Sequence, residues 1–202
     1  VTVMLTLTSL SVGFLLGFPA GAIEVYGDGV LRRVVTVAGG LLRGTPIVVI
    51  LLVLFFVVSV SESAFITATV GLGLLSAAYQ AQLFRGALQS VDDGQLEAAR
   101  ATGMGKLQAI RHVVVPQALR RSMPGFQNEF TIVLKDTSIA FAIGLAELLT
   151  QGYNLFTQSG RSTAVLEVFL VISAVYFVLT FLTNRGLDRV SDYYAIPAGE
   201  NR

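Results

Sequence analysis

Long apolar segments dominate this chain, and the first of them restricts the possible fold most. Residues 1–23 contain no charged side chain, and about 20 apolar residues are enough for a helix to cross the hydrocarbon core of a membrane. Over the whole chain the mean hydropathy is +0.71 and only 13% of the residues are charged, whereas a soluble domain carries about 25% charged residues. The chain is therefore predicted to be an integral membrane protein.

The apolar segments predict an all-α polytopic protein with five transmembrane helices in a single domain of residues 1–190. In the first segment, Gly13, Gly17 and Gly21 share one helical face, which predicts close packing on another helix. In the second, we expect Arg43 near the inner interface, which its long side chain can reach. The expected spans are residues 1–23, 42–60, 64–83, 124–149 and 164–183, with a cytoplasmic loop at 85–123 and a polar cytoplasmic tail at 191–202.

The distribution of basic residues predicts the orientation of these spans. Lys and Arg collect on the cytoplasmic side of membrane proteins. Five spans place Arg32, Arg33, Arg85, the loop at 85–123 and the residues from Arg185 onward on one side, and leave Arg161 alone on the other. We therefore expect the N-terminus outside and the C-terminus in the cytoplasm.

A polar segment between the third and fourth apolar segments carries the most specific motif. It reads Glu97-Ala98-Ala99, three residues, Gly103, nine residues, and Val113-x-Val115-Pro116. Asp92 or Asp93 can cap a first helix, and Gly103 and Gly105 favour a left-handed turn that lets another surface come close. Pro116 suits the first position of a further helix. The segment therefore predicts a helix-turn-helix knob that docks into a partner, with an amphipathic loop without a partner as the alternative; the basic residues behind the knob are Lys106, Arg111, Arg120 and Arg121.

This spacing resembles the EAA loop of the membrane-spanning subunits of prokaryotic ABC importers, with Val in place of Ile and Leu in the final Ile-x-Leu-Pro. The resemblance extends from about Leu5 to Leu187, and it looks like the polar amino acid branch of these permeases, the histidine, glutamine and arginine type. The segments that carry it are Leu42-Arg43-Gly44-Thr45-Pro46, Ser76-Ala77-Ala78-Tyr79, Phe84-Arg85-Gly86, Pro116-Gln117-Ala118-Leu119, Asn128-Glu129-Phe130 and Leu134-Lys135-Asp136-Thr137-Ser138.

The resemblance implies a type I ABC importer permease fold in the prokaryotic cytoplasmic (inner) membrane. It implies a homodimer or a heterodimer with a second permease, an extracytoplasmic amino-acid-binding protein, and separate ATPase subunits that bind ATP and Mg. The residues implied in ATPase coupling are Glu97, Ala98, Ala99, Gly103 and Pro116.

The chain itself is expected to be a transporter subunit that binds no cofactor. It lacks the Gly-x4-Gly-Lys-[Ser/Thr] loop of ATPases, because the segment Gly103 to Lys106 has neither the leading Gly nor the hydroxyl residue. Membrane lipid is an expected partner, and nucleic acid is not.

Polar side chains at membrane depth are the candidates for substrate binding, because such groups need an internal partner or a water-filled cavity. Ser76, Tyr79 and Gln80 lie at i, i+3 and i+4 and are expected on one inward face. Thr137 and Ser138 add short hydroxyls, and the resemblance implies that Glu147 contacts substrate from the outer half of a midplane cavity. The sequence departs from the family at Leu75, where many members carry Asn, which leaves the ligand chemistry at that position open.

Lys135 and Asp136 are adjacent charges in the expected fourth span. Neighbours on a regular helix point about 100° apart and do not pair. Either the helix is unwound there, which would expose backbone groups to a zwitterion, or each residue forms an ion pair with another helix. We favour the ion pair, since intramembrane charges usually pair.

Other classes of protein fit less well. An intramembrane enzyme needs a nucleophile and base within reach, and the only His is His112 in the polar loop; with no Cys and one His, the sequence also predicts no metal site. A passive channel subunit and an importer of another solute, such as a quaternary ammonium osmolyte, remain alternatives, although the absence of Trp disfavours a cation-binding aromatic cage.

Overall fold

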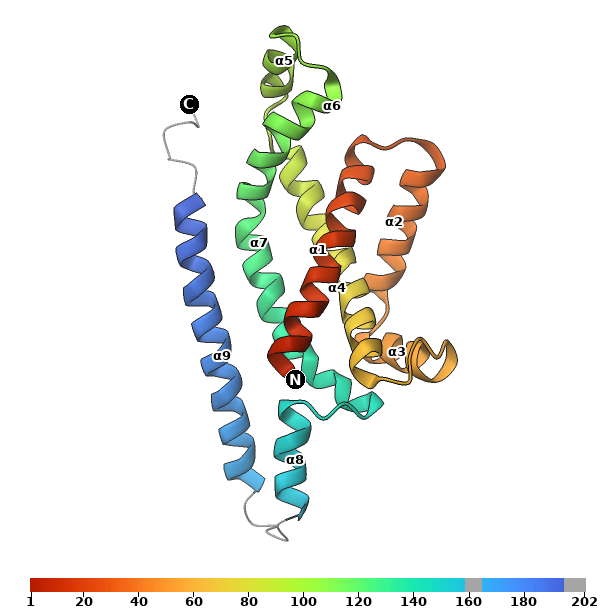
Figure 1. The fold of residues 1–202 in the computed structure, drawn as a ribbon, viewed down its shortest axis with the longest axis vertical. Helices are drawn as coiled ribbons and strands as arrows, with labels where there is room; N and C mark the ends of the chain where they lie inside the picture. Colours follow the sequence, from red (N-terminus) through yellow and green to blue (C-terminus); the bar gives the residue numbers. More distant parts are fainter. Residues whose placement is uncertain (159–164, 195–202) are drawn as a thin grey trace.

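A computed structural model describes residues 1–158 and 165–194, and every element in them is helical. The helix labels follow Figure 1, and η marks a π-helix in η1 and η2 and a 3-10 helix in η3. The elements are α1 (Thr2–Tyr26), α2 (Gly29–Gly44), α3 (Ile47–Leu52), η1 (Val53–Val57), α4 (Ala64–Gln89), α5 (Asp93–Ala101), α6 (Lys106–Ala109), η2 (Ile110–Val114), α7 (Val115–Asp136), η3 (Thr137–Ile143), α8 (Leu148–Gln158) and α9 (Val165–Tyr194).

The helices run mostly along the long axis of the molecule, with α5 and α6 at one end and α8 at the other (Figure 1). Among the described residues, α1, α4 and α9 are each long and apolar enough to cross a membrane. The pair formed by α2 and α3–η1 also qualifies, but it is bent by 105°. The prediction of a helical membrane protein is confirmed, whereas the number of five spans stays a prediction.

The predicted glycine stripe packs α1 directly on α4. A Cβ atom at Gly17 would lie 2.7 Å from the carbonyl oxygen of Ala77, and one at Gly21 would lie 2.7 Å from that of Ala81. The two backbones therefore approach closely, as small residues allow between membrane helices. Four aromatic rings then join α1 and α4 to α7: Phe14, Phe18, Phe84 and Phe126.

Two apolar clusters close the bundle toward its ends. The cluster toward α8 joins α1, α3, α4 and η3, and the cluster below the α5–α6 hairpin joins α4 to η2 and α7. Their buried members are Leu5, Leu51, Ala68, Leu72, Ala140 and Ile143 in the first, and Ala87, Leu88, Val91, Val114 and Ala118 in the second.

The segment expected as the second span, residues 42–60, is not one continuous helix, and its crossing of the membrane stays a prediction. The chain turns between Gly44 and Ile47 because Pro46 disfavours a helical conformation in Thr45, which is extended at φ −106° and ψ 130°. Arg43 therefore ends α2, about 21 Å from the start of that helix, and donates to the carbonyl oxygen of Ala78 in the middle of α4 at 2.7 Å. It does not lie at the helix start near the inner interface as expected.

The segment expected as the fourth span, residues 124–149, does not coincide with one helix either. Pro124 lies inside α7, which begins at Val115 and gives way to η3 after Asp136. Gly144, in the left-handed conformation with φ 79°, ends η3 before α8 begins. Residues 191–194 of the predicted tail are helical, whereas residue 164, Arg161 and residues 195–202 lie outside the described residues.

Candidate functional sites: the coupling hairpin and two buried polar clusters

The helical hairpin α5–α6 projects from one end of the bundle (Figure 1). The predicted cap is confirmed at Asp92, whose carboxylate accepts from the backbone N–H of Gly94 at 2.7 Å. The left-handed turn is confirmed at Gly103, with φ 93°. Gly105 does not share it, because at φ −64° and ψ 155° it is the extended residue that precedes α6.

The tip of the hairpin is exposed and its base is anchored. Glu97, Ala98 and Gly103 are exposed, while Ala99 is buried. At the base, Arg121 donates to the carbonyl oxygen of Ser90. The side chain of Leu107 is 79% exposed, which leaves a large apolar group at the tip without cover from its own chain.

Pro116, which is exposed, lies in the first turn of α7 as predicted, but no break separates α7 from the preceding helix. α6 continues through the π-helical segment η2 into α7, and the backbone N–H of Val115 bonds to the carbonyl oxygen of Ile110, five residues earlier. A π-turn of this kind widens the helix locally, and it accommodates a proline that offers no N–H. The segment from Lys106 to Asp136 is therefore one continuous helical rod.

A buried polar cluster joins α4 to α7 and α1. The hydroxyl of Ser76 donates to Oε1 of Glu129 at 2.7 Å, and Nε2 of Gln80 donates to Ser76 Oγ at 3.0 Å and to the carbonyl oxygen of Leu10 at 3.4 Å. Gly13 leaves the space that the Gln80 amide occupies. Ser76 and Gln80 are 1% and 0% exposed, so they bind other helices and do not line an open cavity.

Tyr79 leaves the face that it was expected to share, since 39% of it is exposed. Glu129 is the residue that the sequence reasoning missed in this cluster. The sequence did indicate it, because a carboxylate within an expected membrane span requires a bonding partner on another helix.

A second buried cluster surrounds Glu147, which is 1% exposed at the start of α8. Its carboxylate accepts from the backbone N–H groups of Leu149 and Thr150, both at 2.8 Å, from the Thr150 hydroxyl at 2.8 Å and from the Tyr176 hydroxyl at 3.1 Å. Glu147 is therefore the cap of α8 and a link to α9. Contact of this carboxylate with a substrate stays a prediction, and it requires some of these bonds to open.

Thr137 adjoins the Glu147 cluster, because its hydroxyl interacts with that of Tyr176, which also donates to Glu147. The Thr137 hydroxyl donates to the carbonyl oxygen of Leu134 and the Ser138 hydroxyl to that of Lys135, both at 2.7 Å. Both hydroxyls thus bond to the preceding turn of their own helix. A substrate role for either residue stays a prediction.

Lys135 and Asp136 form no ion pair with another helix within the described part of the chain. The favoured ion-pair lock therefore stays a prediction. The helix changes from α to 3-10 directly after Asp136, so it continues in a tighter form and is not unwound at this point. The ion pair that is present joins Arg85 of α4 to Glu24 of α1, at 3.5 Å, with the Glu24 side chain 4% exposed.

The structure combines candidate membrane helices with a helical hairpin that projects from one end of the bundle. Comparisons with known proteins show which class of membrane protein has this architecture. Residues 13–191 match the family described as "Binding-protein-dependent transport system inner membrane component". The chain belongs to this family.

Among relatives, the chain is 40% identical over 146 residues to the "Probable amino-acid permease protein YxeN" of Bacillus subtilis, a match that covers 69% of this chain and 64% of that protein. It is 32% identical over 194 residues to the "Glutamine transport system permease protein GlnP" of Escherichia coli, which covers 94% of this chain and 87% of that one. Its relatives are thus permease subunits of amino acid importers, as the resemblance implied.

Solved structures show the same fold. The structure described as "Crystal structure of an amino acid ABC transporter with histidines" superposes with a TM-score of 0.85 at 31% identity, covering 95% of this chain and 90% of that one. The MetNI methionine ABC transporter superposes with a TM-score of 0.83 at 22% identity, covering 96% and 93%, and supports the fold alone. The predicted permease fold and the multi-pass inner-membrane location are confirmed. The family consists of transporter subunits whose ATPase is a separate chain, so the chain is not an enzyme.

Proposed function

We propose that this chain forms part of the translocation path of an ATP-driven importer for polar amino acids and is driven through the α5–α6 hairpin. ATP and Mg bind to the separate ATPase, whose surface groove receives the hairpin tip. A second permease chain, identical or different, completes the path, and an extracytoplasmic amino-acid-binding protein delivers the substrate.

The observation that carries this proposal is the exposed apolar side chain of Leu107 on an otherwise anchored hairpin. A large apolar group with 79% of its surface exposed at the tip of a polar projection gains stability when a partner covers it. The residues implied in coupling surround this tip, with Glu97, Ala98 and Gly103 exposed.

The orientation proposed with this function places the hairpin in the cytoplasm and the N-terminus outside. It is supported by Arg32 in the first turns of α2, Arg85 near the end of α4 and Arg185 in the last third of α9. The start of α2 and the ends of α4 and α9 lie toward the hairpin end of the bundle (Figure 1). Because the chain contains no Cys, a single cysteine in the variant Lys106→Cys can be labelled selectively. We expect an impermeant thiol reagent to label it only in opened cells; labelling in intact cells would reverse the orientation.

Docking is tested by replacing Leu107 with Ala. Burying a whole Leu side chain stabilises by about 1.5 to 3 kcal/mol, so loss of most of that group should cost about 1 to 2 kcal/mol, or roughly 5- to 30-fold in affinity. The measurement is ATPase binding to the permease complex in lipid nanodiscs. Val30→Ala is a matched control, because Val30 is 78% exposed at the start of α2. Equal affinities of the two variants would contradict docking through this tip.

A further inference from the structure

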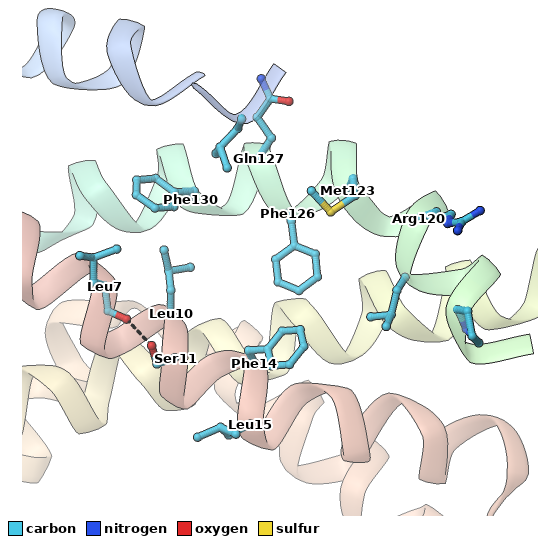
Figure 2. Close-up of a pocket in the computed structure, with 13 residues that line it drawn as sticks. Leu7, Leu10, Ser11, Phe14, Leu15, Arg120, Met123, Phe126, Gln127 and Phe130 are labelled. Carbon is cyan, nitrogen blue, oxygen red and sulfur yellow. Dashed lines mark hydrogen bonds between the residues drawn. The ribbon is translucent and has the colours of Figure 1, made fainter. Parts of the chain in front are cut away.

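An apolar groove of about 810 Å³ runs between α1, α7 and α9. Phe14 of α1 and Phe126 of α7 meet at its middle, with ring centroids 5.6 Å apart, and Figure 2 shows Phe130 toward one end and Arg120 toward the other. Leu187 adds a wall from α9. The groove is therefore a long apolar channel along the bundle with a cationic residue at one end.

Arg120 is the polar lining group that is left for a ligand. The other two polar side chains of the lining are already bonded: Ser11 donates to the carbonyl oxygen of Leu7 at 2.8 Å, and Gln127 donates to Oδ1 of Asp188 at 2.6 Å. Arg120 is exposed, and within the described part of the chain it has neither a hydrogen bond nor an ion pair. A ligand of this groove thus needs a long apolar part and an anionic end.

The length of the groove matches one leaflet of a membrane. Ten residues of α7 separate Arg120 from Phe130, a rise of about 15 Å, and half of a hydrocarbon core of about 30 Å is the same distance. In the orientation proposed above, Arg120 lies at the cytoplasmic end and Phe130 deeper in the membrane.

We propose that this groove binds one acyl chain of an anionic phospholipid from the cytoplasmic leaflet, with the lipid phosphate at Arg120. A guanidinium group binds phosphate with two parallel charge-assisted hydrogen bonds, and basic sites between membrane helices on the cytoplasmic side suit anionic headgroups. A zwitterionic amino acid fits poorly, because the aromatic and aliphatic walls offer its ammonium group no acceptor. The bound chain lies against α1, α7 and α9.

The site is tested with a photoreactive acyl chain carried by two headgroups. The intact permease–ATPase complex is placed in nanodiscs that contain a small fraction of either phosphatidylglycerol or phosphatidylcholine with a diazirine in the chain, and the labelled peptides are identified by mass spectrometry. We expect phosphatidylglycerol to label residues 7–15 and 119–130 preferentially. Arg120→Gln should reduce this labelling about five-fold, the value of about one basic residue near an anionic lipid. Arg33→Gln, an exposed basic residue on α2, should leave it unchanged.

A second variant addresses the apolar part of the site. Met123→Trp places a bulky ring in the groove and should reduce labelling by both lipids. Equal labelling by the two lipids, unaffected by Arg120→Gln, would overturn the proposal, since the groove would then contact only bulk lipid. Absence of labelling together with disulfide formation between two copies of Met123→Cys would also overturn it, because the groove would then be a subunit interface. Uptake of amino acids measured in the same complex distinguishes failure of the lipid proposal from failure of the proposed import function. Transport without labelling refutes only the lipid site.

Discussion

The bond between Ser76 and Glu129 is the most direct test of how α4 and α7 are joined. Ser76→Ala removes the hydroxyl that donates to Glu129 and accepts from Gln80, at 2.7 and 3.0 Å. Side-chain hydrogen bonds between membrane helices contribute about 0.6 to 1.7 kcal/mol each. Only the bond to Glu129 joins two helices, since Ser76 and Gln80 both lie in α4, so its loss should lower the free energy of unfolding by about 0.6 to 1.7 kcal/mol.

The assay is denaturant unfolding of the permease in mixed micelles. Ser11→Ala is the control, because the Ser11 hydroxyl is exposed and bonds within its own helix, so its loss should change the free energy by under about 0.5 kcal/mol. A double-mutant cycle between Ser76→Ala and Glu129→Ala should give a coupling energy of about the same size as one bond. Equal stabilities of the two serine variants, or an additive cycle, would refute the reasoning.

Two further predictions concern the helix contact and the helix cap. Gly17→Ala should destabilise the protein by about 1 to 3 kcal/mol, because the new Cβ would lie 2.7 Å from the Ala77 carbonyl oxygen. Gly40→Ala has open space around it and should stabilise the protein by up to about 1 kcal/mol. The same unfolding assay checks both variants, and the reverse order of stabilities would contradict the α1–α4 contact. Glu147→Gln should cost about 1 to 2 kcal/mol through the α8 cap and lower uptake of cationic and neutral amino acids by the same factor. Selective loss of the cationic substrate would instead assign its carboxylate to substrate recognition.

The sequence predicts those features that depend on local chemistry. The cap at Asp92 and the left-handed Gly103 follow from the preferences of single residues in a turn, and the structure contains both. The glycine stripe of α1 follows from helical periodicity, which holds over a regular segment of 25 residues. In each case one segment contains all the information.

Features that combine distant segments, or that contradict a regular helix, were not predicted. Ser76 and Glu129 are 53 residues apart, and their sequence neighbours do not show that the two helices face each other. The turn at Pro46 had a local signal in the restricted residue before proline, but the apolar run was interpreted by its length. Glu147 illustrates a third difficulty, since a buried carboxylate can cap a helix or bind a cationic ligand, and the sequence did not predict the four donors that make it a cap.

The arrangement of these contacts suggests how movement of the hairpin reaches the membrane. Because Lys106 to Asp136 form one continuous helical segment, a displacement of the tip is transmitted to α7. α7 is bonded to α4 by Ser76 and Glu129, and α4 is packed on α1 without intervening side chains at Gly17. The three helices should therefore move as one body, and the weaker connection is that of α9. We infer that Ser76→Ala, besides lowering stability, reduces uptake per ATP hydrolysed, since it loosens α4 from the rod while leaving the ATPase contact intact. An unchanged ratio of uptake to hydrolysis would show that α1 and α4 follow α7 through apolar packing alone.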